Sequence, residues 1–177
     1  MRLTGLVYRA HNPRWSFAPH SGDGAARYGG RFNPPGVPAL YTSRRMETAW
    51  LEAQQGFPFK AQPLTICAYE VDCADIADLG DSDGRRGLGL DLADLACAWE
   101  DLAARGIAPP SWQLSSRLIR EGYAGIIVPS FAPGAAPTDR NVVFWRWSDA
   151  LPHKVLVVDD ESRLPRDGRS WEPEITS

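Results

Sequence analysis

Hydrophobic positions change their spacing several times along the chain, which predicts a mixture of strands and helices. Short runs rich in β-branched and aromatic residues predict strands at residues 3–9, 39–42, 64–71, 123–129, 141–147 and 154–158. The strand 64–71 is expected to be a central strand, paired on both sides. Apolar residues at helical spacing predict helices at residues 44–55, 92–105 and 111–121, which stop at Gly56, Gly106 and Gly122. Because helices and strands do not alternate strictly, the pattern favours an α+β fold over a doubly wound parallel sheet.

Two long connections and a polar tail separate or follow these elements. Residues 11–36 are rich in Gly, Pro and Ser, and Trp15 and Phe17 are expected to pack this segment onto the body of the protein. Residues 74–89 are acidic and rich in glycine, which predicts a surface connection, and the string at 84–89 lacks the spacing of a phosphate-binding loop. The sequence therefore predicts one domain at residues 1–158 and a loose C-terminal extension at residues 159–177.

The composition limits the class of protein. With 177 residues and 44% hydrophobic content, the chain is long enough for one globular domain with its own core. Its net charge of −3 provides no basic footprint, so we expect no direct contact with nucleic acid. The sequence shows no signal-peptide segment and no apolar run of membrane-spanning length, and its three cysteines form no CxxC pair. We therefore expect no membrane contact and a cytoplasmic location.

A turn of almost fully specified backbone surrounds Arg31. The string Gly-Gly-Arg-Phe-Asn-Pro-Pro-Gly at residues 29–36 combines glycines, which allow positive φ, with prolines, which fix φ and lack an N–H group. A guanidinium group in such a stiff loop is well suited to a phosphate, because it can bind two phosphate oxygens at once. The alternative is a plain turn that leads into the strand 39–42 and leaves Arg31 in solvent.

The helix predicted at 44–55 carries two candidate carboxylates. Its apolar stripe consists of Met46, Ala49, Trp50 and Ala53. Glu47 and Glu52 lie at opposite edges of this stripe, where a side chain either reaches a cleft or simply faces solvent. Periodicity does not choose between the two.

Two further side chains are candidates because of their positions in or after strands. Ser130 directly follows the strand 123–129, where a hydroxyl either holds a ligand or belongs to an ordinary loop. Tyr41 lies in the strand 39–42, either as a core aromatic with a bonded hydroxyl or as a stacking surface for a planar ring. The three histidines show no metal-binding spacing and no GxSxG nucleophile motif occurs, so we expect a site without a metal.

Together these motifs resemble the RES family, which is named after an Arg, a Glu and a Ser. The resemblance extends from about residue 8 to residue 147, and its most specific part is the string 29–36 followed by Leu-Tyr-Thr-Ser at 40–43. Glu52 in Ala-Trp-Leu-Glu-Ala and Ser130 in Val-Pro-Ser complete it. The resemblance implies a fold similar to that of ADP-ribosyltransferases of the diphtheria-toxin type. It also implies a toxin of a bacterial toxin–antitoxin pair, with NAD+ as substrate and an Xre-type helix-turn-helix antitoxin as partner.

The resemblance implies roles for individual residues as well. Arg31, Asn33, Tyr41 and Ser130 would bind NAD+, with Arg31 at the pyrophosphate and the Tyr41 ring against the nicotinamide. The catalytic set would be Arg31, Tyr41, Glu52 and Ser130. In it, the Glu52 carboxylate would stabilise the oxocarbenium-like ribosyl cation that forms as nicotinamide leaves. Many related transferases carry this glutamate late in the chain on a strand, so Glu52 on an early helix departs from their pattern.

Different acceptors for the ADP-ribose are compatible with this chemistry. We expect transfer to a target protein, for which phosphoribosyl pyrophosphate synthetase is the precedent within the family. The alternatives are hydrolysis by water and phosphorolysis by phosphate, both of which deplete NAD+. A non-catalytic module that binds a nucleotide or a partner is the alternative from another class, and it would show affinity without turnover.

Overall fold

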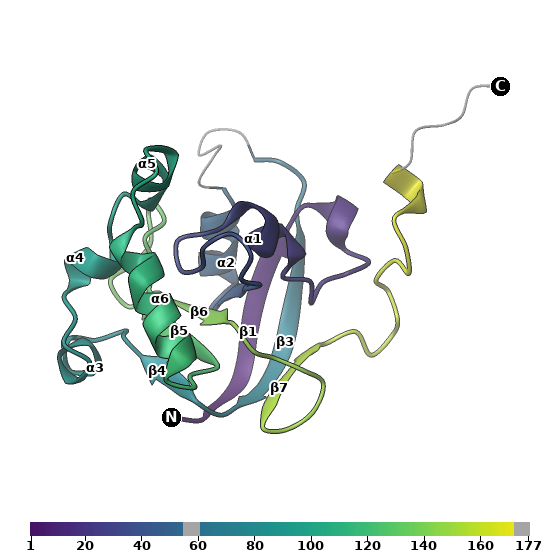
Figure 1. Cartoon of the computed structure of the whole chain (residues 1–177). Helices are drawn as coiled ribbons and strands as arrows, with labels where there is room; N and C mark the ends of the chain where they lie inside the picture. Colours follow the sequence, from purple (N-terminus) through teal and green to yellow (C-terminus); the bar gives the residue numbers. More distant parts are fainter. Residues whose placement is uncertain (55–60, 172–177) are drawn as a thin grey trace.

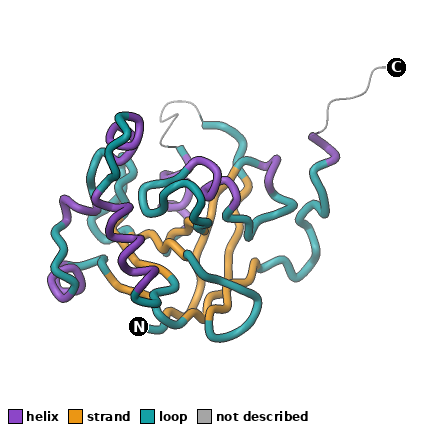
Figure 2. The backbone as a smooth tube through the Cα atoms, in the orientation of Figure 1, coloured by secondary structure: helices purple, strands orange, loops and turns teal. Residues whose placement is uncertain are grey.

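The computed structural model describes residues 1–54 and 61–171, and a single seven-stranded sheet forms its centre (Figures 1 and 2). The strands are β1 (Leu3–His11), β2 (Leu40–Ser43), β3 (Thr65–Cys73), β4 (Ile76–Asp78), β5 (Gly125–Pro129), β6 (Arg140–Phe144) and β7 (His153–Val157). Their order across the sheet is β4-β5-β6-β2-β1-β3-β7. All neighbouring strands in this described sheet run antiparallel except β4 and β5, which are parallel. The architecture is therefore a mixed α/β domain dominated by antiparallel pairing.

Short helices surround the sheet. They are α1 (Asp23–Tyr28), α2 (Met46–Ala53), α3 (Ser82–Gly87), α4 (Leu92–Leu95), α5 (Trp99–Ala104) and α6 (Pro110–Arg120), with 3-10 turns η1 (Pro13–Trp15) and η2 (Arg169–Trp171). Helices α3 to α6 gather beside β4, β5 and β6, whereas α2 packs against β1 (Figure 1). Within the part of the chain that the structure describes, no helix is both long and apolar enough to cross a lipid bilayer.

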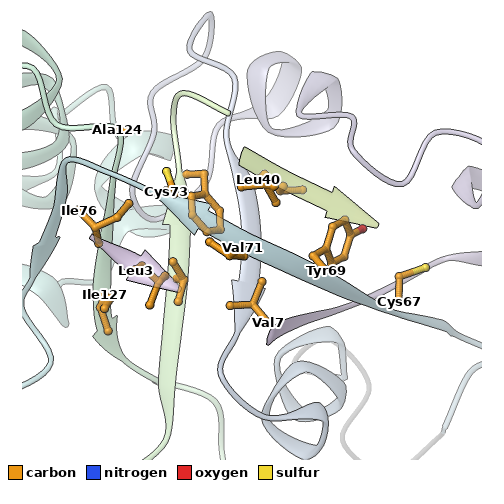
Figure 3. Packing of buried hydrophobic residues seen from close by; sticks show 13 residues of the cluster. Leu3, Val7, Leu40, Cys67, Tyr69, Val71, Cys73, Ile76, Ala124 and Ile127 are labelled. Atoms are coloured by element: carbon orange, nitrogen blue, oxygen red, sulfur yellow. The ribbon is translucent and has the colours of Figure 1, made fainter. Parts of the chain in front are cut away.

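The core lies on both faces of the sheet, because successive side chains of a strand point to opposite sides. On β6, Val142 and Phe144 belong to one buried cluster and Val143 belongs to the other. Figure 3 shows the first cluster, in which side chains of β1, β2 and β3 meet. The second cluster joins β5 and β6 to Leu95 of α4 and to Leu114 of α6. Helices α4 and α6 are thereby fixed to the face that also carries the functional site.

The predicted strands are present with small shifts at their ends, but the prediction for residues 74–89 is wrong. The strand at 64–71 corresponds to β3, which pairs with β1 on one side and with β7 on the other, so it is an interior strand as predicted. The strand at the middle of the sheet is β2, which has only four residues. Residues 74–89 contain β4 and α3, because Ile76 and Leu79 are fully buried despite their acidic, glycine-rich surroundings. A few apolar residues scattered among many acidic and glycine residues give too weak a pattern to predict a strand.

The first long connection and the first predicted helix also differ from their predictions. Residues 11–36 are not a simple connection but contain η1 and α1, and Trp15 and Phe17 are exposed rather than packed down. Helix α2 buries Thr48 and Ala49, whereas Met46 and Trp50 of the predicted apolar stripe are 49% and 41% exposed. Small side chains let α2 approach β1 closely, which explains why the buried face is not the most apolar one. The predicted stop at Gly56 lies outside the described residues.

The segment 92–105 forms two helices, α4 and α5, instead of one. A cap between the side chains and backbones of Asp91 and Asp94 begins α4, and Ala98 leaves the helical conformation with ψ of 66°. Beyond the last strand, Leu164 packs against the first core cluster, so the beginning of the extension at 159–177 is attached to the sheet. The boundary at residue 158 stays a prediction.

Candidate active site

Residues 29–36 form a loop whose backbone is held at almost every point. The amide of Gly30 donates to the carbonyl of Asn33 at 2.9 Å, and the indole nitrogen of Trp112 on α6 donates to the carbonyl of Gly30 at 2.7 Å. On the other side, the indole nitrogen of Trp145 donates to the carbonyl of Phe32 at 2.9 Å. A Cβ atom on Gly30 would lie only 2.5 Å from the Tyr41 hydroxyl, so this position accepts only glycine. The loop is therefore a rigid mount for the residue between Gly30 and Phe32.

That residue is Arg31, and its guanidinium group is half-buried rather than solvated. Nη1 donates to the carbonyl of Cys97 at 2.7 Å and to that of Leu95 at 3.4 Å, and the group stacks on the Phe131 ring at 4.9 Å. Burial lowers the pKa of Arg31. The two carbonyl groups come from the junction of α4 and α5. The break in the predicted helix 92–105 thus supplies the acceptors that fix the arginine.

Tyr41 and Asn33 form a hydrogen-bonded pair behind the loop. The Tyr41 hydroxyl donates to Asn33 Oδ1 at 2.7 Å and accepts from the Phe32 amide at 3.0 Å. The Asn33 amide nitrogen donates to the carbonyls of Ala25 and Val37, both at 2.8 Å, and Asn33 has no exposed surface. Desolvation raises the pKa of Tyr41. In this arrangement, Asn33 supports the loop from behind, and Tyr41 faces the cleft with its ring.

Glu52, at the end of α2, receives two side-chain hydrogen bonds on the same oxygen atom. The hydroxyl of Ser130, just beyond β5, and the amide nitrogen of Asn141 on β6 both donate to Oε1 at 2.5 Å. Glu47 is different, since its side chain is 72% exposed and pairs with Arg45 at 3.5 Å. The structure thus brings Glu52 and Ser130 together, and it separates the two glutamates that periodicity left equivalent.

Two hollows meet at Glu52. The larger has a volume of about 470 Å³ and contains the Arg31 loop, with aromatic walls formed by Tyr28, Trp99 and Phe131. The smaller has a volume of about 310 Å³ and lies against β1 and the buried side of α2. The residues that line both hollows are Arg9, Tyr41, Glu52 and Asn141. A ligand with two linked halves could therefore occupy both hollows, with its connecting bond beside Glu52.

Sequence reasoning missed two polar residues of this shared wall. Arg9 on β1 donates through Nη1 to the carbonyls of Pro19 and Ser21, both at 3.0 Å, so it ties the segment before α1 to the cleft. The signal for Arg9 was its charge, since it is the one Arg, Lys, Asp or Glu residue of a largely apolar strand. Asn141 gave less signal, because an asparagine at the start of a predicted strand is ordinary. Its importance depends on the partner that the fold places beside it.

Metal-binding side chains do not gather at this cleft. Among residues 1–54 and 61–171, no group of three or more His, Cys, Asp or Glu side chains is placed to hold a metal ion. The cleft offers the carboxylates of Glu52 and Glu100, the guanidinium groups of Arg9 and Arg31, and aromatic walls. A dinucleotide fits this composition, because guanidinium groups bind its phosphates and aromatic rings stack on its planar groups. The lining of the cleft is therefore compatible with a dinucleotide, and the Glu52 carboxylate lies where the two hollows meet.

Comparison with known proteins assigns the chain to a family. The RES domain family matches residues 6–167, and the chain therefore belongs to the RES family. It is 29% identical over 128 residues to proteins named NAD(+) phosphorylase MbcT from Mycobacterium tuberculosis and Mycobacterium bovis. These alignments cover 66% of this chain and 69% of the relatives.

A solved structure is similar in fold. A chain from the crystal structure of the M. tuberculosis MbcT–MbcA toxin–antitoxin complex matches with a TM-score of 0.58 and 20% sequence identity. The match covers 90% of this chain and 84% of that chain, so the fold is shared over nearly its whole length. The family resemblance seen in the sequence is thus confirmed.

Proposed function

We propose that this protein is an enzyme that cleaves NAD+ at the bond between nicotinamide and ribose, and that it acts as the toxin of a toxin–antitoxin pair. The observation that carries the proposal is the position of Glu52, which the donors Ser130 and Asn141 hold where the two hollows meet. NAD+ has two parts joined at this scissile bond. With ADP-ribose in the larger hollow and nicotinamide in the smaller one, the bond lies beside the carboxylate.

The neighbouring residues supply binding and orientation. Arg31 in the larger hollow binds the pyrophosphate, and Phe131 and Trp99 provide apolar surface for the adenosine. Tyr41 presents its ring to the nicotinamide, since its hydroxyl is occupied by Asn33 and Phe32. The Glu52 carboxylate offsets the positive charge that develops on the ribose as neutral nicotinamide departs. Ser130 and Asn33 act indirectly in this scheme, through Glu52 and through the loop.

The acceptor that we favour is inorganic phosphate. Relatives at 29% identity are named NAD(+) phosphorylase, which supports phosphate over water or a protein side chain. In that reaction the carbon–nitrogen bond to nicotinamide breaks, a phosphate oxygen forms a new bond to the same ribose carbon, and ADP-ribose phosphate is released. The transfer to a target protein that the sequence suggested, including transfer to phosphoribosyl pyrophosphate synthetase, stays a prediction, as does hydrolysis. The likeness to diphtheria-toxin-type transferases likewise stays a prediction.

An antitoxin partner completes the proposal. The solved structure with the same fold is a toxin–antitoxin complex, which supports a protein partner that restrains the enzyme. We expect the partner to be of the Xre helix-turn-helix type and to cover the cleft near Arg31 and Tyr41. DNA contact would then belong to the partner, in keeping with the net charge of −3 of this chain.

One labelling experiment tests the reaction and identifies the acceptor. The purified protein is incubated with NAD+ labelled in its ADP-ribose half, with and without phosphate, and with and without cell lysate. A product that requires phosphate supports phosphorolysis, free ADP-ribose indicates hydrolysis, and labelled protein bands indicate transfer. Binding of NAD+ without any release of nicotinamide would instead support the non-catalytic binding module and overturn the proposal.

A further inference from the structure

A line of polar side chains crosses the middle of the sheet and ends at Glu52. The Ser43 hydroxyl on β2 donates to Asn141 Oδ1 at 2.7 Å, and Asn141 Nδ2 donates to Glu52 Oε1 at 2.5 Å. Ser43 is 2% exposed and lies in the wall of the smaller hollow, as Asn141 and Glu52 do, so the whole line follows that wall. It joins a central strand, its neighbour β6 and helix α2.

Strand register creates this line. Ser43 and Asn141 lie directly opposite each other in the antiparallel pair of β2 and β6, so their side chains share one face of the sheet. Tyr41 and Val143, two residues along each strand, form the next opposite pair, and both line the larger hollow. The same register that builds the wall of the cleft thus brings Asn141 beside Glu52.

The chemistry of the groups determines which way the Asn141 amide points. A carboxylate only accepts hydrogen bonds, so the amide nitrogen must face Glu52 and the amide oxygen must face away. The oxygen then needs a donor, and the Ser43 hydroxyl provides one. Each member of the line therefore supports the orientation of the next, and the final result is a fixed position of one carboxylate oxygen.

We propose that Asn141 is a positioning residue for NAD+ cleavage, and that Ser43 acts through it. Asn141 holds the Glu52 carboxylate beside the ribose carbon, and Ser43 stabilises the amide orientation that this requires. The inference rests on the proposed function and extends it to residues that do not themselves react. The competing interpretation is that Asn141 only fills space between β6 and α2.

Two substitutions of Asn141 distinguish positioning from packing. N141A removes the donor, and N141D keeps the shape but places a second carboxylate against Glu52. We expect kcat for nicotinamide release to fall about 10- to 100-fold in N141A, because a small misplacement of a catalytic group has an effect of this size. The kcat of N141D should be lower still, and KM for NAD+ should stay within about twofold in both variants. A purely structural role predicts the reverse order, with the isosteric N141D more active than N141A, and that order would overturn the proposal.

A double-mutant cycle tests the part played by Ser43. S43A alone should lower kcat about threefold to tenfold, because Asn141 loses one of its fixing bonds. In the N141A background, S43A should have no further effect on kcat, since its influence passes through the amide. Additive losses in the double variant would overturn the role of Ser43.

The contact can also be tested without any turnover. In NMR spectra of the protein without NAD+, the side-chain amide signals of Asn141 should move when Glu52 is replaced in E52A, whereas E47A should leave them in place. Unmoved signals in E52A would overturn the inference even if the enzyme is active. A wild-type protein that releases no nicotinamide would overturn the proposed function, and the role of Asn141 in that reaction with it.

Discussion

Arg31 and Glu52, two charged groups of the cleft, are held in different ways. Arg31 is fixed by main-chain carbonyl groups, from Cys97 and Leu95, and its loop is fixed by further bonds to the backbone. Glu52 accepts hydrogen bonds from two side chains, those of Ser130 and Asn141. Main-chain acceptors persist when a neighbouring residue type changes, whereas side-chain donors do not. The hydrogen bonds of the Arg31 guanidinium should therefore survive substitution of Cys97 or Leu95, whereas those of Glu52 should be lost on substitution of Ser130 or Asn141.

The largest expected effect is that of removing the carboxylate charge. In E52Q the side-chain oxygen still accepts from Ser130 and Asn141, so the fold is kept while the ribosyl cation loses its counter-charge. We expect kcat for nicotinamide release to fall about 100- to 1000-fold, and expression of the variant alone to be harmless to cells. E47Q is the matched control on the same helix and should behave like the wild type. If E47Q proved to be the inactive variant, the catalytic glutamate would be misassigned.

Replacement of Arg31 should weaken binding more than it slows chemistry. R31A loses a charge-assisted contact worth about 1.5–3 kcal/mol, which raises KM for NAD+ roughly 10- to 100-fold. R27A is the control, because Arg27 lies on the adjacent helix α1 and contacts the Tyr28 ring but does not line the larger hollow. Steady-state kinetics of both variants separate KM from kcat. An unchanged KM in R31A would remove Arg31 from the pyrophosphate site.

The Tyr41 hydroxyl should matter for stability rather than for the chemical step. Y41F leaves Asn33 Oδ1 and the Phe32 amide without a partner behind the loop. The expected loss in the free energy of unfolding is about 1–3 kcal/mol, measured by urea denaturation. The KM for NAD+ should rise only a few-fold as the Arg31 loop loosens. If kcat instead fell as far as in E52Q while stability stayed the same, the hydroxyl would have to act on the substrate.

The smallest effect concerns pH and His11, at the edge of the smaller hollow. Burial lowers the pKa of His11 to about 4, with a further contribution from Arg9, and its buried Nδ1 atom has no hydrogen-bond partner among the described residues. The unfolded chain then binds more protons than the folded one between pH 6.5 and about 4. The free energy of unfolding should therefore fall as the pH is lowered through this window. Below about pH 4, His11 should cause no further change in it.

Melting temperatures measured between pH 7 and about 4.5 test this prediction. H11Q should lose less stability over that range than the wild type, because the substituted side chain does not titrate. Part of the slope should remain, since burial also lowers the pKa of His20 and gives a contribution of the same sign. Identical slopes for H11Q and the wild type would show that His11 does not destabilise the folded state at low pH.

Local sequence patterns were sufficient for some parts of this site and not for others. The Gly and Pro residues around Arg31 specify a loop by themselves, so the loop and its arginine could be predicted. The break between α4 and α5 could not, because Ala96 and Ala98 are good helix formers and the carbonyl groups there serve a residue more than sixty positions earlier.

The difference between Glu52 and Glu47 is also invisible to local patterns. Both glutamates lie at the edge of an apolar stripe, and only the approach of β6 and of the segment after β5 distinguishes them. Asn141 acquires its importance in the same way, from the register of β6 against β2. Long-range strand pairing sets these positions, and periodicity along one segment carries no information about it.

The place of β6 in the sheet has a consequence for the synthesis of the protein. In the order of the sheet, this strand lies between β5 and β2 and pairs with both. It also follows β1 to β5 in the chain, so the ribosome releases it after most of the sheet. Until β6 is added, Glu52 and Ser130 belong to separate, unjoined parts of the nascent chain. Under the proposed function, a chain that ends before β6 is therefore expected to lack activity, because it lacks Asn141 and the pairing that β6 provides.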